Sequence, residues 1–267
     1  MKKLVALAVF LLLVSSSAGI MRVSVYVAGA IDGKIPHYDI PEDAAGEPVS
    51  FLVVWENTGS IGCSFRLRAD VYERVDGTLQ PVYSSWSAEA PIEPGGVADL
   101  EAFWYPDKSG EYSVRTFLYF CNSIDEGPSG NFSVTAANRS RLPGLPAEVR
   151  ASRNLEYVEF AINPKDNLSS VVIVPRDYPL GWAFSSVRKD GLVAGQDNVV
   201  RVGYRAEIWK EANVTFDFVS SDGRYYQPVT VELKKPEPFP VYEAVIVVLV
   251  LVVLILFDYQ DLMLNKC

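Results

Sequence analysis

Apolar and polar residues alternate along most of the chain between its two ends. In the stretch SFRLRADVYERV, every second residue from Phe65 to Val71 is apolar, and YSVRTFLYF repeats the pattern from Tyr112 to Phe120. A period of two residues is typical of a β-strand that is buried on one face. Further stretches of this kind are VEFAI, SVVIV, NVVRVGYRAEI, NVTFDFV and PVTVEL. The pattern predicts an all-β protein, with no helix between the two terminal segments.

Turn signals separate these stretches. Asp-Gly pairs begin at Asp32, Asp76, Asp190 and Asp222 and predict tight turns. The apolar run FLVVWE ends at Asn57-Thr58-Gly59. We interpret Asn57 as a turn residue rather than a ligand-binding residue, because Asn and Gly tolerate left-handed backbone. Short strands with turns at this spacing are typical of β-sandwiches.

One segment lacks the alternation and divides the chain. AANRSRLPGLPAE is first polar and then rich in proline and glycine, as linkers are. We therefore expect two tandem immunoglobulin-like β-sandwiches, over residues 19–135 and 147–235, joined by a linker at 136–146. Pro236, Pro238 and Pro240 then predict a short extended stalk over 236–240.

Both ends of the chain carry targeting signals. Residues 1–18 combine two lysines, an unbroken apolar run and the small residues Ser16-Ser17-Ala18, which predicts a secretory signal peptide cleaved after Ala18. An uncleaved N-terminal anchor is the alternative. Near the other end, Ala244–Phe257 has no polar side chain, and the segment counted back to Phe239 is about 28 Å long as a helix.

The terminal segments define a topology. We expect a transmembrane helix over 241–257 and a cytoplasmic tail over 258–267, with the domains outside the cell. Lys234 and Lys235 lie on the outer flank of this helix, against the usual positive-inside bias. We take the orientation from the signal peptide, because the first segment usually fixes it.

The first domain resembles a known family. Asn57-Thr58-Gly59 ends an apolar strand, Pro94-Gly95 marks a later turn, and Gly110-Glu111-Tyr112 opens a late strand. This order resembles the CARDB family of cell-adhesion-related domains of bacteria and archaea, over about residues 45–135. The resemblance implies an immunoglobulin-like fold, in which Tyr112 would be the residue of a tyrosine corner.

The second domain shows a weaker resemblance. YPLGWAFS followed by GLVAGQDNVVRVGYRA is similar to a pattern in immunoglobulin-like modules appended to glycoside hydrolases and archaeal surface proteins. The similarity extends over residues 147–235. It implies an immunoglobulin-like fold, not sugar binding.

Two of the three cysteines are candidates for a disulfide. Cys63 opens one predicted strand and Cys121 closes another, so their ends coincide if these strands are neighbours. An exported protein permits oxidation, and we predict a Cys63–Cys121 bond. Cys121 is out of phase with the buried face of its strand, which requires a bulge or a strand end there. Cys267 lies beyond the predicted membrane helix, where a free thiol is expected and lipidation is the alternative.

Four sequons are candidates for glycosylation. They begin at Asn131, Asn138, Asn167 and Asn213. Asn131 and Asn213 alternate with apolar neighbours, so we expect both side chains to face solvent. Chance alone would supply one or two such tripeptides, and coincidence remains the alternative for any single site.

Composition argues against several function classes. The net charge of −9 without a basic cluster disfavours nucleic acid as a partner. His37 is the one histidine of the chain, which leaves little material for a catalytic triad or a His/Cys metal site. We therefore predict no catalytic residues, no metal site and no cofactor.

Aromatic residues supply the candidate contact surface. Phe117 and Tyr119 fall opposite the apolar face of their strand, and Trp86 lies in the polar stretch YSSWSAEAP, which we expect to be a loop. Exposed aromatic side chains commonly mark protein or sugar contacts. The alternative is that the neighbouring domain covers Phe117 and Tyr119.

These expectations favour a single-pass protein of the cell membrane that uses tandem immunoglobulin-like domains for adhesion, envelope assembly or partner recognition, without catalysis. Its expected partners are the membrane and an extracellular protein or glycan. One alternative is an accessory ectodomain subunit of a transport or secretion complex. Another is a surface hydrolase or carbohydrate-binding module, which a groove lined by Trp86 or Trp182 with facing carboxylates would favour.

Overall fold

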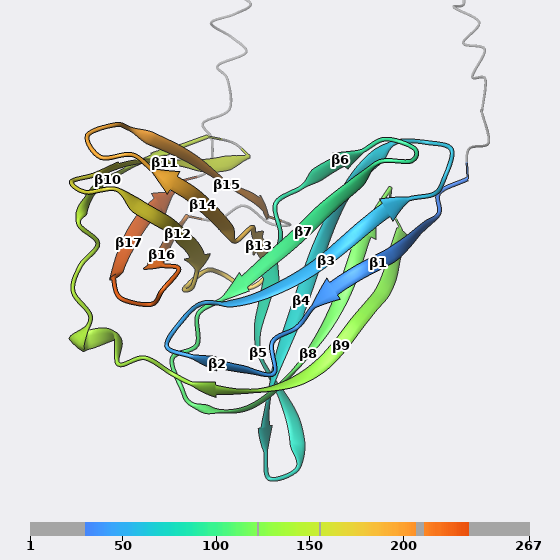
Figure 1. Ribbon diagram of the computed structural model, residues 1–267, viewed down its shortest axis with the longest axis horizontal. Helices are drawn as coiled ribbons and strands as arrows, with labels where there is room; N and C mark the ends of the chain where they lie inside the picture. The colour runs from blue at the N-terminus through green and yellow to red at the C-terminus, as the bar shows by residue number, and fades with distance from the viewer. Residues whose placement is uncertain (1–29, 122, 155, 207–210, 235–267) are drawn as a thin grey trace, which may run out of the picture.

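The computed structural model describes residues 30–121, 123–154, 156–206 and 211–234 (Figure 1). The predicted signal peptide, stalk, membrane helix and tail lie outside these residues. Within the described part the protein is all-β, as predicted, and its one helical element is the short 3-10 helix η1 (Arg139–Arg141). None of the described segments forms a helix long and apolar enough to cross a membrane.

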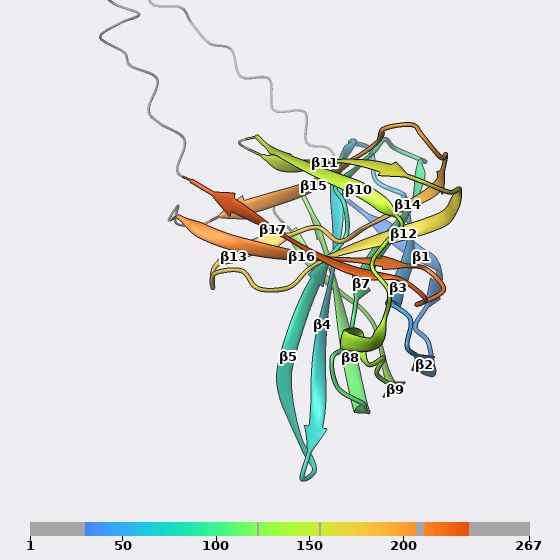
Figure 2. The same ribbon diagram turned by 90° about the vertical axis from the view of Figure 1, so that its left-hand side faces the viewer.

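Residues 30–135, the N-terminal module, form two sheets that enclose a core. A three-stranded antiparallel sheet has the order β1-β3-β7, with β1 (Gly33–Asp39), β3 (Val49–Asn57) and β7 (Val97–Trp104). The larger sheet has the order β2-β9-β8-β4-β5, with β6 also paired to β4. Its strands are β2 (Asp43–Ala45), β4 (Cys63–Val75), β5 (Thr78–Trp86), β6 (Ala90–Ile92), β8 (Gly110–Phe120) and β9 (Ser123–Thr135). The β4–β5 hairpin projects beyond the rest of the module (Figure 2).

Residues 147–234, the C-terminal module, form two four-stranded sheets around a second core. One sheet has the order β10-β11-β15-β13, with β10 (Ala147–Arg153), β11 (Tyr157–Pro164), β15 (Asn198–Ala206) and β13 (Trp182–Phe184). The other has the order β14-β12-β16-β17, with β14 (Val187–Leu192), β12 (Leu168–Pro175), β16 (Ala212–Ser220) and β17 (Tyr226–Leu233).

The buried faces follow the predicted alternation. Phe65, Leu67, Ala69 and Val71 of β4 are fully buried in the first core. The alternate residues of β8 from Tyr112 to Phe120 are buried with them. Burial of apolar side chains removes their surface from water, which is the main favourable term in folding. The Tyr112 hydroxyl donates a hydrogen bond to the carbonyl of Lys108 at 3.0 Å, the geometry of a tyrosine corner.

Asn57 is a structural turn residue. Its side chain is fully buried and donates hydrogen bonds to the carbonyls of Ile61 and Ile92, at 2.9 and 3.0 Å. Its backbone joins the Pro94-Gly95 turn, because the N–H of Gly95 donates to the Asn57 carbonyl at 2.7 Å. The two turn motifs of the first domain therefore hold each other in place.

Two of the four Asp-Gly predictions are wrong. Asp76-Gly77 makes the β4–β5 turn, with both residues at positive φ, and Asp222-Gly223 turns between β16 and β17. Asp190-Gly191, however, lies inside β14, where Gly191 at φ 63° lets the strand kink and continue. Asp32-Gly33 leads directly into β1 without a reversal.

Candidate functional site

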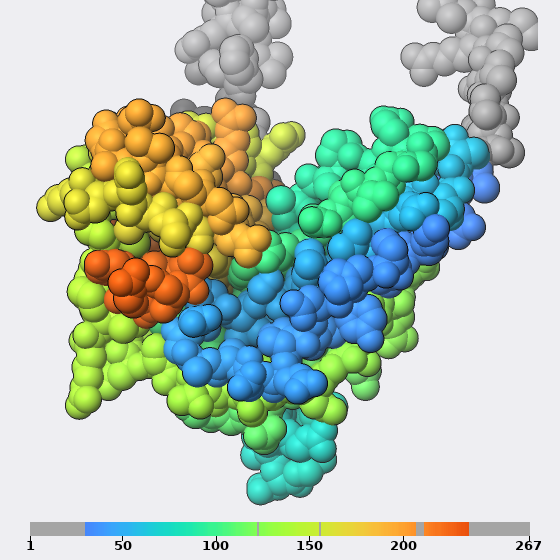
Figure 3. Space-filling model, in the orientation of Figure 1, coloured from blue at the N-terminus to red at the C-terminus, as the bar shows by residue number. Residues whose placement is uncertain are grey.

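The two modules are joined by backbone hydrogen bonds as well as by side chains. Ser186, between β13 and β14, donates its N–H to the Trp86 carbonyl at 2.7 Å. Its hydroxyl accepts the N–H of Phe103 at 2.6 Å and lies 3.0 Å from the Ser85 hydroxyl. Both serines are buried, and these bonds satisfy hydroxyl groups that would otherwise be costly to bury. The modules meet along a continuous seam (Figure 3).

A small apolar cluster fills one part of this seam. Its buried members come from both modules and are Phe103, Tyr105, Val172, Val174 and Val219. Tyr83 packs against them, and its hydroxyl donates to the carbonyl of Pro175 in the other module. The seam therefore has a small apolar core of its own, formed by both modules.

Beside this core lies the Arg139 cluster, made of Arg139, Tyr105, Tyr226, Arg176 and Asp217. The Arg139 guanidinium lies over the Tyr105 ring at 4.5 Å and 3.2 Å from the Asp217 carboxylate. Arg176 approaches the same carboxylate at 3.4 Å, and the Tyr226 hydroxyl donates to it at 2.9 Å. Asp217 is 1 % exposed, so a buried carboxylate neutralises the arginines that surround it.

Burial controls the titration of this carboxylate. It raises the pKa of Asp217 above the ordinary range of aspartate, although Arg139, the Tyr226 hydroxyl and Arg176 each act to lower it. Arg139 belongs to η1 in the segment between the modules. That segment was predicted to be a linker, and it is also part of the seam.

Trp86, Phe117 and Tyr119 lie close together, on the outer face of the larger N-terminal sheet. In the register of β5, β4 and β8, Arg68 stands opposite both Trp86 and Phe117. The Trp86 and Tyr119 rings are 4.9 Å apart, and the Arg68 guanidinium lies 4.7 Å from the Phe117 ring. The sheet thus brings all three candidate contact residues around one arginine.

These three rings are not fully exposed. Trp86 ends β5 instead of lying in a loop, because Ser84 and Ser85 continue the pairing with β4. All three rings are half-buried, and the N-terminal module's own Arg68 covers them. The Tyr119 hydroxyl accepts a hydrogen bond from Arg68, whose other arm lies 2.9 Å from Asp70. Arg68 therefore has a carboxylate partner.

Arg66 is the unusual residue of this face. It is 7 % exposed, and its guanidinium lies over the Trp86 ring at 4.8 Å. Its Nε makes no hydrogen bond, and no carboxylate of the described residues forms an ion pair with it. Burial, together with the nearby charge of Arg205, lowers the pKa of Arg66 to about 10, while Glu89 acts to raise it.

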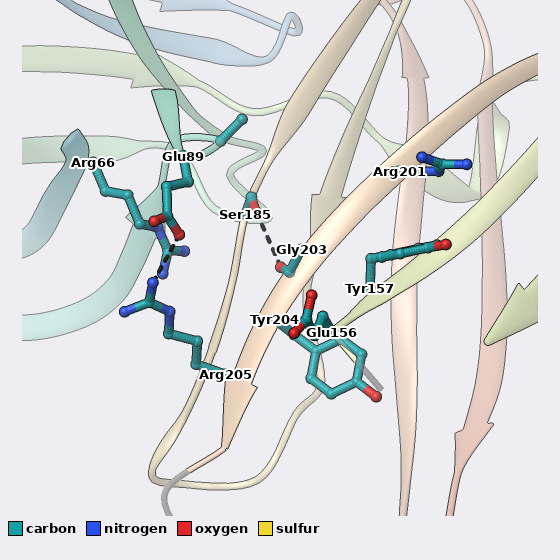
Figure 4. Close-up of a pocket in the computed structure, with 10 residues that line it drawn as sticks. Arg66, Glu89, Glu156, Tyr157, Ser185, Arg201, Gly203, Tyr204 and Arg205 are labelled. Atoms are coloured by element: carbon teal, nitrogen blue, oxygen red, sulfur yellow. Dashed lines mark hydrogen bonds and ion pairs between the residues drawn. The ribbon is translucent and has the colours of Figure 1, made fainter. Parts of the chain in front are cut away.

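The second module supplies the facing cation. Arg205 of β15 lies 2.7 Å from the carboxylate of Glu89, which precedes β6. Figure 4 shows Arg66 and Arg205 pointing toward the same space, with Glu89 beside them. Three cavities, of about 600, 420 and 370 Å³, share Arg66 and Arg205 in their walls.

The cavity of about 420 Å³, here called the arginine–aromatic cleft, has an unusual wall. It contains three arginines and three aromatic residues but no carboxylate. Its residues are Arg66, Arg68, Arg205, Trp86, Tyr119 and Trp182, with Ser84, Gly181 and Ala183. In a chain of net charge −9, this is a local concentration of positive charge between the modules.

The predicted disulfide between Cys63 and Cys121 is present in the structure, with Cα atoms 5.8 Å apart. Cys63 opens β4, and Cys121 follows the end of β8 at φ 41°, which is the strand end that its phase required. Both cysteines line the cavity of about 370 Å³ beside Arg66 and Tyr119. The bond thus borders a cavity that shares Arg66, Tyr119 and Arg205 with the cleft.

The predicted glycosylation sites lie away from the cleft walls. The side chains of Asn131, Asn138, Asn167 and Asn213 are exposed. Asn131 accepts a hydrogen bond from the Ser113 hydroxyl at 2.6 Å, and Asn167 accepts the N–H of Ala194 at 2.8 Å. Modification of these sites stays a prediction.

The lone histidine, His37, is not among the residues that line the cleft. His37 is exposed on β1, an edge strand of the smaller sheet. No cluster of three or more His, Cys, Asp or Glu side chains within the described segments could hold a metal ion. The absence of a metal, of a cofactor and of catalysis stays a prediction.

The arginines of the seam were not among the predicted site residues. Arg66 and Arg68 alternate with the buried residues of β4, so the outer face of this strand was readable as basic. Arg205 and Arg139 come from distant parts of the chain, and only the packed modules bring them to the seam. The sequence pattern that indicates this site is a strand face that carries arginines, beside aromatic residues that are out of phase with the buried set.

Comparisons with known proteins add little. No family model matches the chain, and no curated protein does. The DNA glycosylase AlkC of Pseudomonas fluorescens is 11 % identical over 40 % of this chain and 31 % of its own, with a TM-score of 0.32. Red sea bream transglutaminase is 11 % identical over 77 % of this chain and 31 % of its own, with a TM-score of 0.29. The chain thus spans less than a third of either protein, and likeness at this level identifies neither family nor function.

Proposed function

We propose that this chain is a non-catalytic recognition protein of the cell surface. A signal peptide would deliver two tandem immunoglobulin-like sandwiches, and the helix at 241–257 would anchor them in the membrane. The arginine–aromatic cleft between the modules would contact an extracellular protein partner. The CARDB resemblance of the first domain and the tyrosine-corner hydrogen bond of Tyr112 support the fold assignment.

One observation carries the proposal, namely the make-up of the cleft. Trp, Tyr and Arg are the residues that most often dominate the energy of protein–protein interfaces. Here Trp86, Tyr119 and Arg66 form one packed group at the seam. The modules are held together by hydrogen bonds and an apolar core, which supports a pre-organised group of side chains that loses little freedom on binding.

The hydrolase alternative has less support. It requires a groove lined by Trp86 or Trp182 with two facing carboxylates. Both tryptophans do line the cleft, but the charged residues around them are arginines. Asp70 lies in the neighbouring cavity, and its carboxylate is already paired with Arg68.

The test is a site-dependent capture experiment. Full-length protein carrying an affinity tag is crosslinked in its native membranes and recovered, alongside a variant with Trp86→Ala and Tyr119→Ala. We expect wild type to recover a defined extracellular protein and the variant to lose most of it. The matched control carries Tyr38→Ser and Val97→Ser, two exposed apolar residues of the smaller sheet, and should recover the partner normally.

Two results would contradict the proposal. One is equal recovery of the partner by wild type and by the cleft variant. The other is a hydrolytic activity of the purified protein that His37→Ala abolishes.

A further inference from the structure

Two arginines at the seam, the buried Arg66 and the half-buried Arg139, lie on aromatic rings, and among the described residues only Arg139 pairs with a carboxylate. Arg139 lies 4.5 Å from the Tyr105 ring and 3.2 Å from Asp217. Arg66 lies 4.8 Å from the Trp86 ring, without such a partner among the described residues. The Arg139 cluster shows which group completes this arrangement in the same protein.

The charges around Arg66 favour the binding of a further negative group. Arg205 opposes it across the cleft, and Arg68 lies over the same Trp86 ring at 5.6 Å. Glu89 is already paired with Arg205, and Asp70 with Arg68. Three guanidinium groups therefore share two carboxylates, and Arg66, the most buried of the three, is the one left over. Removing a charge from water without a partner is costly.

We propose that the arginine–aromatic cleft binds a carboxylate side chain from an acidic segment of a protein partner, held between the guanidinium groups of Arg66 and Arg205. This subsite depends on the proposed recognition function and names the chemistry of the contact. A planar guanidinium can donate two parallel hydrogen bonds to a carboxylate. The cleft, at about 420 Å³, has room for one acidic side chain with its flanking backbone.

A peptide fits this cleft better than a glycan does. Sugar rings bind tryptophan by stacking on an open ring face. Around Trp86, the Arg66 guanidinium lies at 4.8 Å and the Tyr119 ring at 4.9 Å, so both already occupy the surroundings of the indole. The net charge of −9 would also repel a polyanionic glycan, whereas one or two carboxylates meet only the local positive charge.

The experiment uses a capped synthetic peptide with one glutamate among glycine, serine and alanine residues. Full-length protein with ¹⁵N-labelled arginine is purified in a mild detergent, and the Nε–H resonances are followed during titration. We expect saturable shifts of the Arg66 and Arg205 resonances. Arg66→Met should weaken binding about tenfold or more, because it removes a buried donor to the carboxylate. The same peptide with glutamine in place of glutamate should bind no better than the Arg66→Met variant binds the glutamate peptide.

Two further variants distinguish the loss of a binding charge from a loss of folding. Arg188→Met removes another arginine that bridges the modules, 3.1 Å from Glu101, and should leave the affinity for the peptide unchanged. Arg205→Gln replaces a more exposed side chain and gives a second measurement if Arg66→Met does not fold. It should also weaken binding.

Three results would overturn the subsite. The first is that wild type and both cleft variants bind the glutamate peptide with equal affinity. The second is that wild type binds the glutamine peptide as tightly as the glutamate peptide. The third is Arg66-dependent binding of polygalacturonate without binding of the peptide, which would assign the cleft to an acidic glycan. If any of these results is obtained while the Trp86→Ala, Tyr119→Ala variant still loses the captured partner, the recognition function stands. Only the proposal that the cleft binds a carboxylate is then rejected.

Discussion

The Arg139 cluster and the arginine–aromatic cleft are two versions of one arrangement at the same seam. Both place a guanidinium on an aromatic ring near residues from both modules. In the Arg139 cluster, Asp217 pairs with the arginine and accepts a hydrogen bond from the Tyr226 hydroxyl. In the cleft, Arg68 and Arg205 pair with carboxylates, and no carboxylate of the described residues pairs with Arg66. The difference is one buried carboxylate.

This difference separates a structural contact from a candidate binding contact. A buried ion pair recovers part of the free energy lost on leaving water, and breaking it is costly. Arg66 loses hydration without that compensation, as the lowered pKa of its guanidinium indicates. Residues that break a local rule without an evident gain in stability are often found at functional sites.

The largest effect is expected from Asp217→Ala. The change leaves Arg139 and Arg176 without their shared carboxylate at a mostly buried position. We expect the free energy of unfolding to fall by about 3–5 kcal/mol, measured by urea denaturation of the purified protein. Asp190→Ala removes an exposed carboxylate 3.5 Å from Arg188 and should cost less than about 1 kcal/mol. Equal losses would mean that the Arg139 cluster is not a structural contact.

The next effect concerns the disulfide, which lines a cavity that shares Arg66 and Tyr119 with the cleft. Replacing Cys63 and Cys121 with serine frees two residues that are 58 positions apart in the chain, and we expect a loss of about 2–4 kcal/mol. Hydrogen exchange should accelerate around Arg66 and Tyr119 before it does around Asp217. Uniform acceleration across the seam would show that the two halves do not open separately.

The smallest effect is a difference in titration between two carboxyls of the C-terminal module. Burial raises the pKa of Asp217 against the pull of its arginines. Burial acts in the same direction on Asp222, but hydrogen bonds from Ser220 and Arg224 outweigh it and lower the pKa of that carboxyl. The two shifts therefore have opposite signs.

The consequences for stability have opposite signs as well. For Asp217, the folded state binds the proton more tightly, so its contribution to stability falls as pH rises from the ordinary aspartate pKa of about 4 through the raised value. For Asp222, the contribution is present above that ordinary value and is lost as pH falls through the lowered one. Carboxyl ¹³C NMR titration measures both directly. A midpoint for Asp217 below that of Asp222 would contradict the assignment.

The local sequence pattern was sufficient to predict the strands, but it was insufficient to predict which residues lie at the seam. The period of two placed Phe65 and Leu67 in the core, since strand alternation needs no information from elsewhere in the chain. Trp86 was expected in a loop because its serine neighbours are polar. One of them, Ser85, is buried through hydrogen bonds to Ser186 and to the carbonyl of Phe103, which no local pattern contains.

For the charged residues too, contacts with distant parts of the chain could not be predicted from local sequence. Arg139 was read as part of a polar linker, because its carboxylate partner Asp217 lies far along the chain on β16. The position of Arg66 on the outer face of β4 was predictable from alternation. Its burial was not, because residues of other strands and of the second module, Trp86 and Arg205 among them, surround it.

Arg139 has a carboxylate partner, Asp217, whereas Arg66 has none among the residues that the structure describes. The most direct measurement compares the free energies of unfolding of Arg66→Met and Arg139→Met, without ligand, in the full-length protein. Methionine keeps an unbranched apolar chain in each position and removes the charge. We predict that Arg66→Met retains or gains stability, and that Arg139→Met loses about 3 kcal/mol or more because it leaves Asp217 buried with too little positive charge. Equal losses in the two variants would contradict the account.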